Sequence, residues 1–294
     1  MSGAYWKVFA EKQAGLKDIT QAREAFIQLY HEYPEDESIP RILFQIALTY
    51  YNEEQYNKAQ QEFQKLAEKH STHEITSQAI YIAGCCAMNL ENYEEAIAIF
   101  ERIPLEDKVK PHAHLGQIRC FMLRGQHENA LKIAEALTKE HKEGPIWVEA
   151  TLRKVDTLFL TATDKPENLK IALKESTALL NSNTTYASWR NRAGFMRGRI
   201  LIEMGRETQA LEAFMDVVYG NYLPSDITQQ AHEPELLWFI KSGLKAAEIK
   251  EDKEDIQGAV AIYRILEQLG STNRGEFRRK IDDLKSRHFI WEES

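Results

Sequence analysis

The chain has 294 residues, of which 43% are hydrophobic and 28% charged, and its formal net charge is −8 at pH 7. An acidic average argues against nucleic acid as the main ligand, because phosphate binding needs a basic face. No apolar run approaches the roughly 18–20 residues that span a bilayer, so membrane insertion is not expected.

Amphipathic helical periodicity runs through almost the whole chain and predicts about seven helix pairs followed by a terminal helix. In chain order the predicted pairs are 4–14 with 18–32, 39–52 with 54–69, 73–89 with 92–103, 110–124 with 127–141, 145–161 with 166–181, 186–204 with 206–219, and 233–250 with 254–269. The terminal helix, 274–290, carries Phe277, Ile281 and Leu284 on one stripe, as expected of a helix that covers the open end of an array. No segment shows the sustained alternation of a strand, so no sheet is expected.

An alanine followed four positions later by an aromatic residue recurs along the chain, at Ala22/Phe26, Ala59/Phe63, Ala96/Phe100, Ala210/Phe214 and Ala259/Tyr263. The first three pairs are spaced 37 residues apart. A period in this range indicates a solenoid of repeated helix pairs. We expect Gly84, Gly198 and the alanines to lie where helix backbones approach closely, and the phenylalanines to fill the space between successive pairs.

These residues resemble the tetratricopeptide repeat (TPR) family, in which small residues and an aromatic lie on a first helix and Ala and Phe on a second. The second repeat, for example, has Ile46-Ala47 and Tyr50 followed by Ala59 and Phe63, and the third has Ala83-Gly84 followed by Ala96 and Phe100. The resemblance covers about 270 residues. It implies an all-α, right-handed α-solenoid of stacked antiparallel helix pairs that forms one array over residues 1–294, with repeats in 3–270 and a capping helix at 274–290.

Three of the predicted pairs depart from the family pattern. The fourth has Ala134 and the fifth Ser176 where phenylalanine is expected, and the seventh has a long acidic turn at 248–255. Looser helix-pair repeats are an alternative there. The repeat spacing of 37 residues and the Tyr-x-x-Tyr-Pro sequence at Tyr30–Pro34 also resemble those of bacterial envelope TPR proteins that assist outer-membrane assembly or cell-wall coordination.

In TPR proteins the first helix of each pair lines a concave groove, and counting from the small residues predicts which side chains face inward. The candidate partner-binding residues are Arg41, Phe44, Tyr51, Tyr81, His112, Arg119, Arg192, Phe195 and Arg199. Aromatic and arginine side chains are enriched at binding hot spots, and a guanidinium suits a carboxylate. The set therefore predicts an acidic peptide or a free C-terminus as ligand. The alternative is that inward-facing side chains simply pack on the neighbouring helix, as we expect for Phe44 and for three further inward-facing residues, Leu48, Leu115 and Ile202.

Catalytic motifs are absent from the sequence. There is no phosphate-binding loop of the GxxxxGK or GxGxxG type and no Gly-x-Ser-x-Gly elbow. His70 and His73 lie three residues apart beside Glu74, a spacing more typical of a solvated turn than of a metal site. Cys85 and Cys86 stand in an apolar helical segment, where a thiol is inert. We therefore expect no enzymatic activity, no cofactor and no metal.

The interpretation that follows is a non-enzymatic scaffold or adaptor that binds a protein or peptide in its concave groove. Two alternatives stay open: a structural component of a bacterial envelope or outer-membrane assembly complex, with homo-oligomers formed through the convex face or an end, and a regulatory segment of a larger protein. The start, Met-Ser-Gly-Ala-Tyr-Trp, shows no signal peptide. A cytoplasmic location is expected if the chain is complete, and a periplasmic one if a signal peptide was trimmed.

Overall fold

The structure is a computed structural model that describes residues 19–182, 187–220, 233–268 and 274–288, and every regular element in these ranges is an α-helix. The first predicted helix, 4–14, lies outside the described residues. The chain divides into two compact units, Met1–Leu137 (unit 1) and Thr138–Ser294 (unit 2), each taken here by itself. The predicted all-α fold of stacked antiparallel helix pairs is confirmed, whereas the single continuous array stays a prediction.

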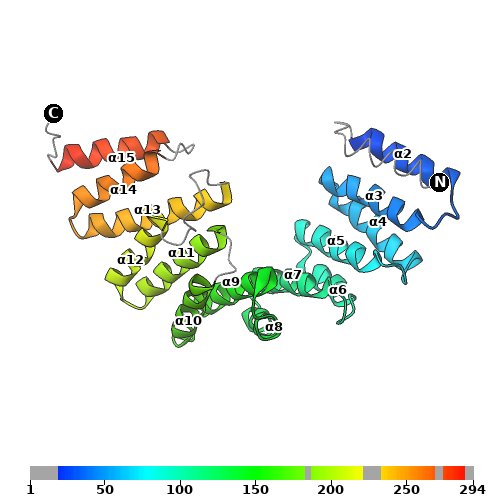
Figure 1. The fold of residues 1–294 in the computed structure, drawn as a ribbon, viewed down its shortest axis with the longest axis horizontal. Helices are drawn as coiled ribbons and strands as arrows, with labels where there is room; N and C mark the ends of the chain where they lie inside the picture. The colour runs from blue at the N-terminus through cyan, green and yellow to red at the C-terminus, as the bar shows by residue number, and fades with distance from the viewer. Residues whose placement is uncertain (1–18, 183–186, 221–232, 269–273, 289–294) are drawn as a thin grey trace. The chain divides into compact units, whose positions relative to one another are not determined.

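Unit 1 contains consecutive helices that lie side by side in chain order (Figure 1). Each helix from α2 to α6 packs on the next, and α5 also packs on α7, so the first helix α5 contacts both its own partner α6 and the first helix of the following pair. The helices are α2 (Ile19–Glu32), α3 (Ile39–Asn52), α4 (Tyr56–Lys69), α5 (Thr76–Asn89), α6 (Tyr93–Glu101), α7 (Lys110–Leu123) and α8 (His127–Glu140), the last of which continues into unit 2.

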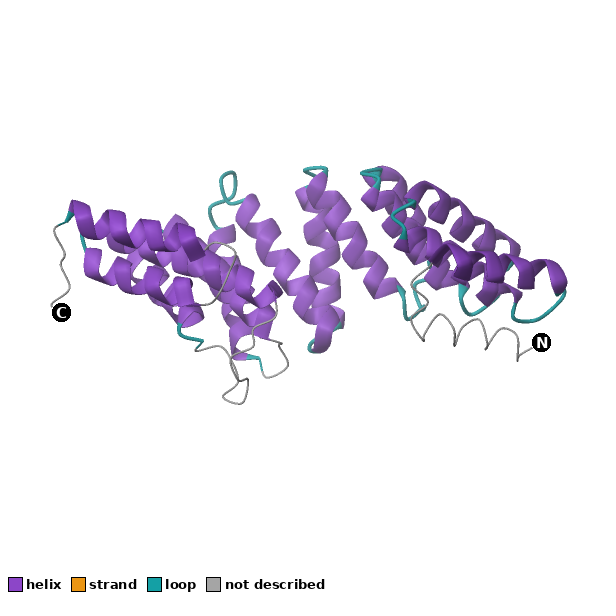
Figure 2. Ribbon diagram, turned by 90° about the horizontal axis from the view of Figure 1, so that it is seen from above, coloured by secondary structure: helices purple, strands orange, loops and turns teal. Residues whose placement is uncertain are grey.

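Unit 2 repeats this arrangement with longer first helices. The first helix α11 packs on its partner α12 and on both neighbouring first helices, α9 and α13. The helices, drawn in purple in Figure 2, are α9 (Gly144–Leu160), α10 (Asn168–Asn181), α11 (Ala187–Glu203), α12 (Glu207–Val218), α13 (Glu233–Asp252), α14 (Ile256–Gln268) and α15 (Arg274–Arg287). The predicted boundaries agree with the observed ones to within a few residues wherever the chain is described.

The same tight turn joins first to second helix in five of the pairs. One residue adopts positive φ, and the backbone N–H that follows it bonds to the carbonyl five residues earlier, as in a Schellman motif. Gly125 and Gly205 hold this position at φ 69° and 70°. In the other three turns it is held by Glu54, Glu91 and Glu254, at φ 58–62°. The corresponding N–H···O distances are 2.8–2.9 Å in all five turns.

The core of each unit is built on the predicted Ala/aromatic pairs, and all five alanines and their aromatic partners are buried. Phe100 illustrates how the pairs are joined. Its ring lies between two helices without side chains at the contact, since a Cβ added to Gly84 of α5 would lie 2.4 Å from the ring and one added to Gly116 of α7 would lie 2.7 Å from it. We call this arrangement the aromatic–glycine seam. In unit 2, Phe214 occupies the corresponding place against Gly198, where an added Cβ would lie 2.4 Å away.

Helix α6 is shorter than its neighbours, with nine residues where α5 and α7 have 14. Its carboxyl end is capped by the ammonium group of Lys110, which donates to the carbonyl of Ile103 at 2.7 Å and to those of Phe100 and Glu101 at 3.3 Å. A cation at this end also complements the helix dipole. Because Lys110 is buried, this contact fixes the segment between α6 and α7, next to Phe100 of the seam.

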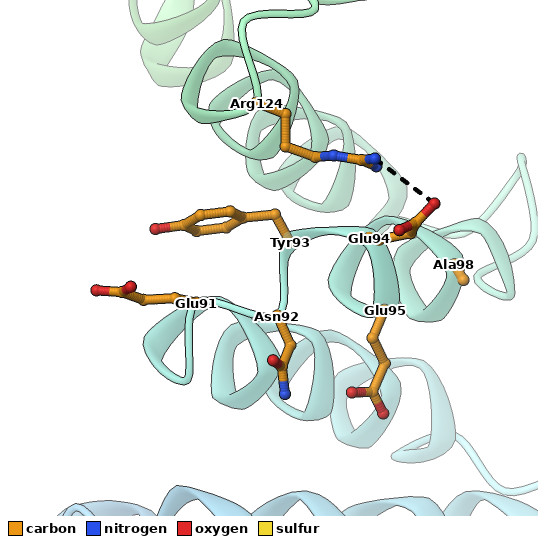
Figure 3. A pocket seen from close by; sticks show the side chains of 7 residues that line it. All are labelled: Glu91, Asn92, Tyr93, Glu94, Glu95, Ala98 and Arg124. Atoms are coloured by element: carbon orange, nitrogen blue, oxygen red, sulfur yellow. Dashed lines mark ion pairs between the residues drawn. The ribbon is translucent and has the colours of Figure 1, made fainter.

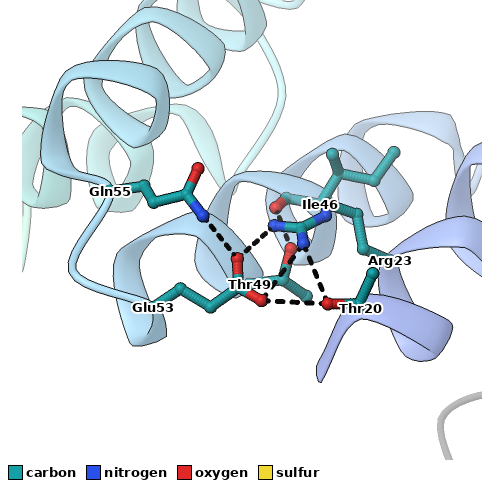
Figure 4. Close-up of polar contacts among 6 residues, drawn as sticks. All are labelled: Thr20, Arg23, Ile46, Thr49, Glu53 and Gln55. Atoms are coloured by element: carbon teal, nitrogen blue, oxygen red, sulfur yellow. Dashed lines mark hydrogen bonds and ion pairs between the residues drawn. The ribbon is translucent and has the colours of Figure 1, made fainter. Parts of the chain in front are cut away.

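A polar cluster joins α2 to the end of α3 (Figure 4). The Arg23 guanidinium donates to both carboxylate oxygens of Glu53, at 2.6 and 3.1 Å, and stacks over the Tyr50 ring at 4.3 Å. Thr20 and Gln55 also donate to the Glu53 carboxylate. The hydrogen bond from Arg23 holds the pKa of Glu53 below its ordinary value of 4.5. Glu53 is therefore ionised in the folded state even in mildly acidic solution.

We predict that Gly84→Ala destabilises the protein by about 1–3 kcal/mol, because the new methyl group meets the Phe100 ring in a filled core. This loss should outweigh the gain of up to about 1 kcal/mol in helix propensity. Gly275→Ala in α15 is the matched control, since nothing lies within 4 Å of its added Cβ. Denaturant unfolding followed by circular dichroism measures both, and equal stability of the two variants would contradict the seam.

A second prediction concerns pH. Because the pKa of Glu53 is lower in the folded than in the unfolded chain, the stability contributed by its contact with Arg23 is present above pH 4.5 and is lost as the pH falls through the folded value. The difference in unfolding midpoint between wild type and Glu53→Gln should therefore be widest above pH 4.5 and narrow below it. Glu68→Gln removes an exposed carboxylate from α4 as control. A difference that is constant between pH 3 and 7 would contradict this account.

Candidate functional site

The predicted groove residues fall into two sets, one on each unit. In unit 1 they lie on α3, α5 and α7. Arg41 of α3 is exposed and paired with Glu74 at 2.6 Å. Phe44 is half-buried and meets the core residue Phe63 edge-on, with ring centroids 5.2 Å apart. Phe44 thus packs on the neighbouring helix, as expected for the non-binding alternative.

Aromatic contacts continue along this face of unit 1. The Tyr51 ring meets Tyr56 at 5.5 Å, and Tyr81 lies between Phe100 of the seam at 5.9 Å and His112 of α7 at 6.2 Å. Burial raises the pKa of Tyr81, so its hydroxyl group is protonated throughout the physiological range. Phe100 of the seam therefore supports Tyr81, one of the aromatic side chains on the first-helix face.

The three cysteines are poor nucleophiles. Burial raises the pKa of Cys86 to about 12 and that of Cys120 to about 11. Burial also raises the pKa of Cys85, although the Tyr81 hydroxyl and the Arg119 charge oppose the rise. Since the thiolate is the reactive form, these groups are inert near neutral pH.

Arg119 of α7 differs from the other predicted arginine of unit 1. Its side chain is exposed and makes no ion pair or hydrogen bond with any residue that the structure describes. The half-buried Cys85, on which the Arg119 charge acts, and the ring of Tyr81 lie on the adjacent first helix α5. Arg119 thus offers an unused guanidinium beside an aromatic surface.

In unit 2, Arg192 and Phe195 of α11 take part in the packing. The Arg192 guanidinium bonds to the Asp156 carboxylate of α9 and lies 5.7 Å from the Trp238 ring. Burial raises the pKa of Asp156, and the Arg192 charge opposes that rise. Phe195 is 7% exposed and contacts both Phe214 and Trp238, at 5.9 and 5.5 Å.

Arg199, one turn after Phe195, is exposed. Its guanidinium stacks over the ring of Phe159 at 4.4 Å and lies 6.0 Å from that of Phe195. Among the described residues it makes no ion pair or hydrogen bond. Stacking leaves the edges of a guanidinium open, so its N–H groups are positioned in advance for a carboxylate.

Sequence reasoning missed three residues of this surface: Phe159 of α9, and Trp238 and Lys241 of α13. Lys241 is exposed and lies 4.7 Å from the centre of the Trp238 ring, on the side of α13 that meets α11 through Phe195. No inward residues were assigned to α9, whose pair has Ser176 in place of phenylalanine, or to α13, whose pair has Tyr263 there. Counting back from Ala259/Tyr263 could have found Trp238 and Lys241 on α13.

A surface pocket of about 680 Å³ lies at the turn between α5 and α6, lined by three glutamates and Arg124 (Figure 3). Arg124 reaches toward Glu94, at 3.5 Å. Glu95 points to the other side, where it accepts a hydrogen bond from Gln60 at 2.5 Å. The pocket is open to solvent, and two of its carboxylates are engaged within the protein, so it behaves as a solvated turn.

Within residues 19–182, 187–220, 233–268 and 274–288, no group of three or more His, Cys, Asp or Glu side chains is placed to hold a metal ion. His73 accepts a hydrogen bond from the backbone of Ile75 at 3.2 Å, which orders the turn before α5. Among these same residues, no helix combines the length and apolar character needed to cross a bilayer.

Residues 22–103, from α2 to α6, match the model of the family described as anaphase-promoting complex, cyclosome, subunit 3. The match covers less than half of the chain. No curated protein matches the chain in sequence.

Several solved structures resemble most of the chain. A tetratricopeptide repeat protein from Parabacteroides merdae is 10% identical over 96% of this chain and 99% of its own, with a TM-score of 0.57. The C-terminal part of a TPR repeat-containing protein from Cytophaga hutchinsonii is 15% identical over 90% and 94%, with a TM-score of 0.60. The apo form of the quorum sensor NprR from B. thuringiensis is 13% identical over 96% and 87%, with a TM-score of 0.53. At such low identity these likenesses show the fold alone.

The contacts of Arg192 and Arg199 on α11 predict stability changes of different size when each side chain is removed. Arg192→Met leaves the half-buried Asp156 carboxylate without its partner and should cost about 2–3 kcal/mol of stability. Arg199→Met removes only an exposed, stacked guanidinium and should change stability by less than about 0.5 kcal/mol. Denaturant unfolding of both variants measures the difference. A larger loss for Arg199→Met would mean that Arg199 serves the fold.

Proposed function

We propose that this chain, a tetratricopeptide repeat protein, is a non-enzymatic scaffold that holds an acidic peptide segment of a partner protein on its first-helix faces. TPR-type helical repeats commonly serve as protein-interaction scaffolds. The finer part of the proposal, the acidic partner and the face that binds it, rests on the side chains of α7, α9, α11 and α13.

The proposal rests on one observation: some of the arginines predicted to face the partner form ion pairs within the protein, and others do not. Arg41 is neutralised by Glu74 in the turn before α5, and Arg192 by Asp156 of the neighbouring first helix α9. Arg119 and Arg199 are exposed and without an ion pair among the described residues, on a chain whose net charge is −8. Unpaired cations next to aromatic rings are the composition found at binding hot spots.

The chemistry of these two positions favours a carboxylate. A guanidinium binds a carboxylate through two parallel N–H···O bonds, which adds geometric selectivity to the attraction between charges. The aromatic surface alongside, with Tyr81 in unit 1 and Phe159 in unit 2, supplies contact area with little loss of side-chain entropy. An acidic side chain and a free C-terminal carboxylate both satisfy this chemistry.

The test is capture of partner proteins from a lysate of the source organism, quantified by mass spectrometry, with wild type and the double variant Arg119→Glu/Arg199→Glu as baits. Charge reversal should lower recovery of the partner at least tenfold, because attraction becomes repulsion. The matched control is Lys132→Glu/Lys170→Glu, which makes the same charge change on the exposed faces of the second helices α8 and α10.

Recovery that is equal for the wild type and the Arg119→Glu/Arg199→Glu variant would overturn the proposal and move the binding surface away from the first helices. Equal loss in both double variants would mean that net charge alone governs binding. Circular dichroism of each bait establishes that the folds are intact.

A further inference from the structure

Helix α13 of unit 2 is apolar on two sides. One side packs into the core through Gly243, Ala246 and Ala247, and an added Cβ at Gly243 would lie 2.7 Å from Leu266. The other side presents Leu237, Lys241 and Leu244 at positions i, i+4 and i+7, which form a single stripe on a helix. Leu237 is 48% exposed and Leu244 40%. We call this stripe the α13 strip.

An open pocket of about 630 Å³ adjoins the strip between α13 and α15. Leu244 forms one wall, Tyr263 and Phe277 form the apolar floor, and residues of α15 form the opposite wall. The Tyr263 and Phe277 rings stack with centroids 6.5 Å apart. The Tyr263 hydroxyl donates to Glu251 at 2.8 Å, so the ring is held in place at its polar end. The pocket therefore offers a preformed apolar surface for one side chain.

The charged groups around the pocket are mostly paired within the protein. On α15, Lys280 pairs with Glu251 at 3.4 Å, and Asp283 pairs with Arg287 at 2.9 Å. Arg279 donates to the carbonyl of Gly275 in its own helix, and Glu276 is exposed beside it. The α15 wall is thus close to neutral and gives no strong preference for either charge.

The positive charge of this surface comes instead from α11 and α13. Lys241 is stacked on Trp238 and, like Arg199, makes no ion pair or hydrogen bond with any described residue. Because Phe195 and Trp238 are in contact, and each cation follows its ring by about one turn, Arg199 and Lys241 lie at the same level on neighbouring helices. Axes of packed helices are about 8–10 Å apart.

We propose that the α13 strip docks a short acidic segment of the partner protein, with one leucine- or phenylalanine-sized side chain in the α13–α15 pocket and carboxylates on Lys241 and Arg199. This inference rests on the proposed function and specifies the kind of partner segment that binds to the first-helix face of unit 2. In a segment of polyproline II conformation, residues three positions apart point to the same side and lie about 9 Å apart, which matches the distance between neighbouring helices. The partner segment is therefore expected to carry two acidic residues at that spacing next to an apolar one.

The experiment selects peptides from a random 12-residue library displayed on phage, with the full chain as the immobilised target. The enriched sequences should combine two or more Asp or Glu residues with one large apolar residue. The affinity of the consensus peptide is then measured by fluorescence anisotropy. Leu244→Glu and Lys241→Glu should each weaken it at least tenfold, and Leu244→Ala, which introduces no charge, at least threefold.

Matched controls lie on α10 of the same unit. Ile171→Glu places a charge on a side chain that is 42% exposed, and Lys170→Glu reverses an exposed cation beside it. Both should bind the peptide within twofold of wild type. Because all the altered side chains are exposed, unchanged thermal midpoints are expected for every variant.

Enriched peptides without acidic residues, or equal affinities for the strip variants and the α10 controls, would overturn the docking strip. A peptide that loses affinity with Arg119→Glu but not with Leu244→Glu would overturn the strip and leave the scaffold proposal standing. Failure of partner capture by the wild-type chain would instead remove the proposed function. A dimer that Leu244→Glu converts to a monomer in sedimentation would assign the strip to a second copy of the chain and also overturn the inference.

Discussion

The structure depends on one packing constraint, an aromatic ring held against helices that carry no side chain at the point of contact. Phe100 lies between Gly84 and Gly116, and Phe214 lies against Gly198. Because protein interiors are packed as densely as organic crystals, a ring of fixed size sets the separation of the helices on either side of it. The Ala/Phe pairs that carry such buried rings recur at a pitch of 37 residues over the first three repeats, which propagates the same helix spacing within unit 1.

The seam also determines which side chains are free to bind. The phenylalanine rings fill the space between helix pairs and leave the opposite face of each first helix open. On that face, some of the predicted arginines form an ion pair with a neighbouring carboxylate and others do not. Arg192 is used by the fold through Asp156, whereas Arg199 rests on Phe159 and has no such partner among the described residues. We attribute binding to the arginine side chains that form no ion pair with any described residue of the protein.

Much of the fold could be predicted because the seam restricts residue size. Ala96, Phe100 and Gly84 reveal the register directly, and Gly125 marks a turn that needs positive φ. Other features could not be predicted. Glu54 and Glu91 adopt the same turn without a residue type that indicates it. The sequence shows Arg41 but not that Glu74, in the turn before the following first helix, neutralises it. Trp238 and Lys241 were missed because α14 has a tyrosine where the repeat has phenylalanine, which weakened the register of its partner helix α13.

The most direct measurement of the central claim is site-specific photocrosslinking to the captured partner. Benzoylphenylalanine in place of Ile202, which is 38% exposed on the first helix α11 one turn after Arg199, should crosslink to the partner. The same group in place of Ile171, 42% exposed on the second helix α10, should not. Crosslinks from position 202 alone, mapped by mass spectrometry to an acidic segment, are the predicted result. Crosslinks from position 171 alone would contradict the account, because they would place the partner on the second helices.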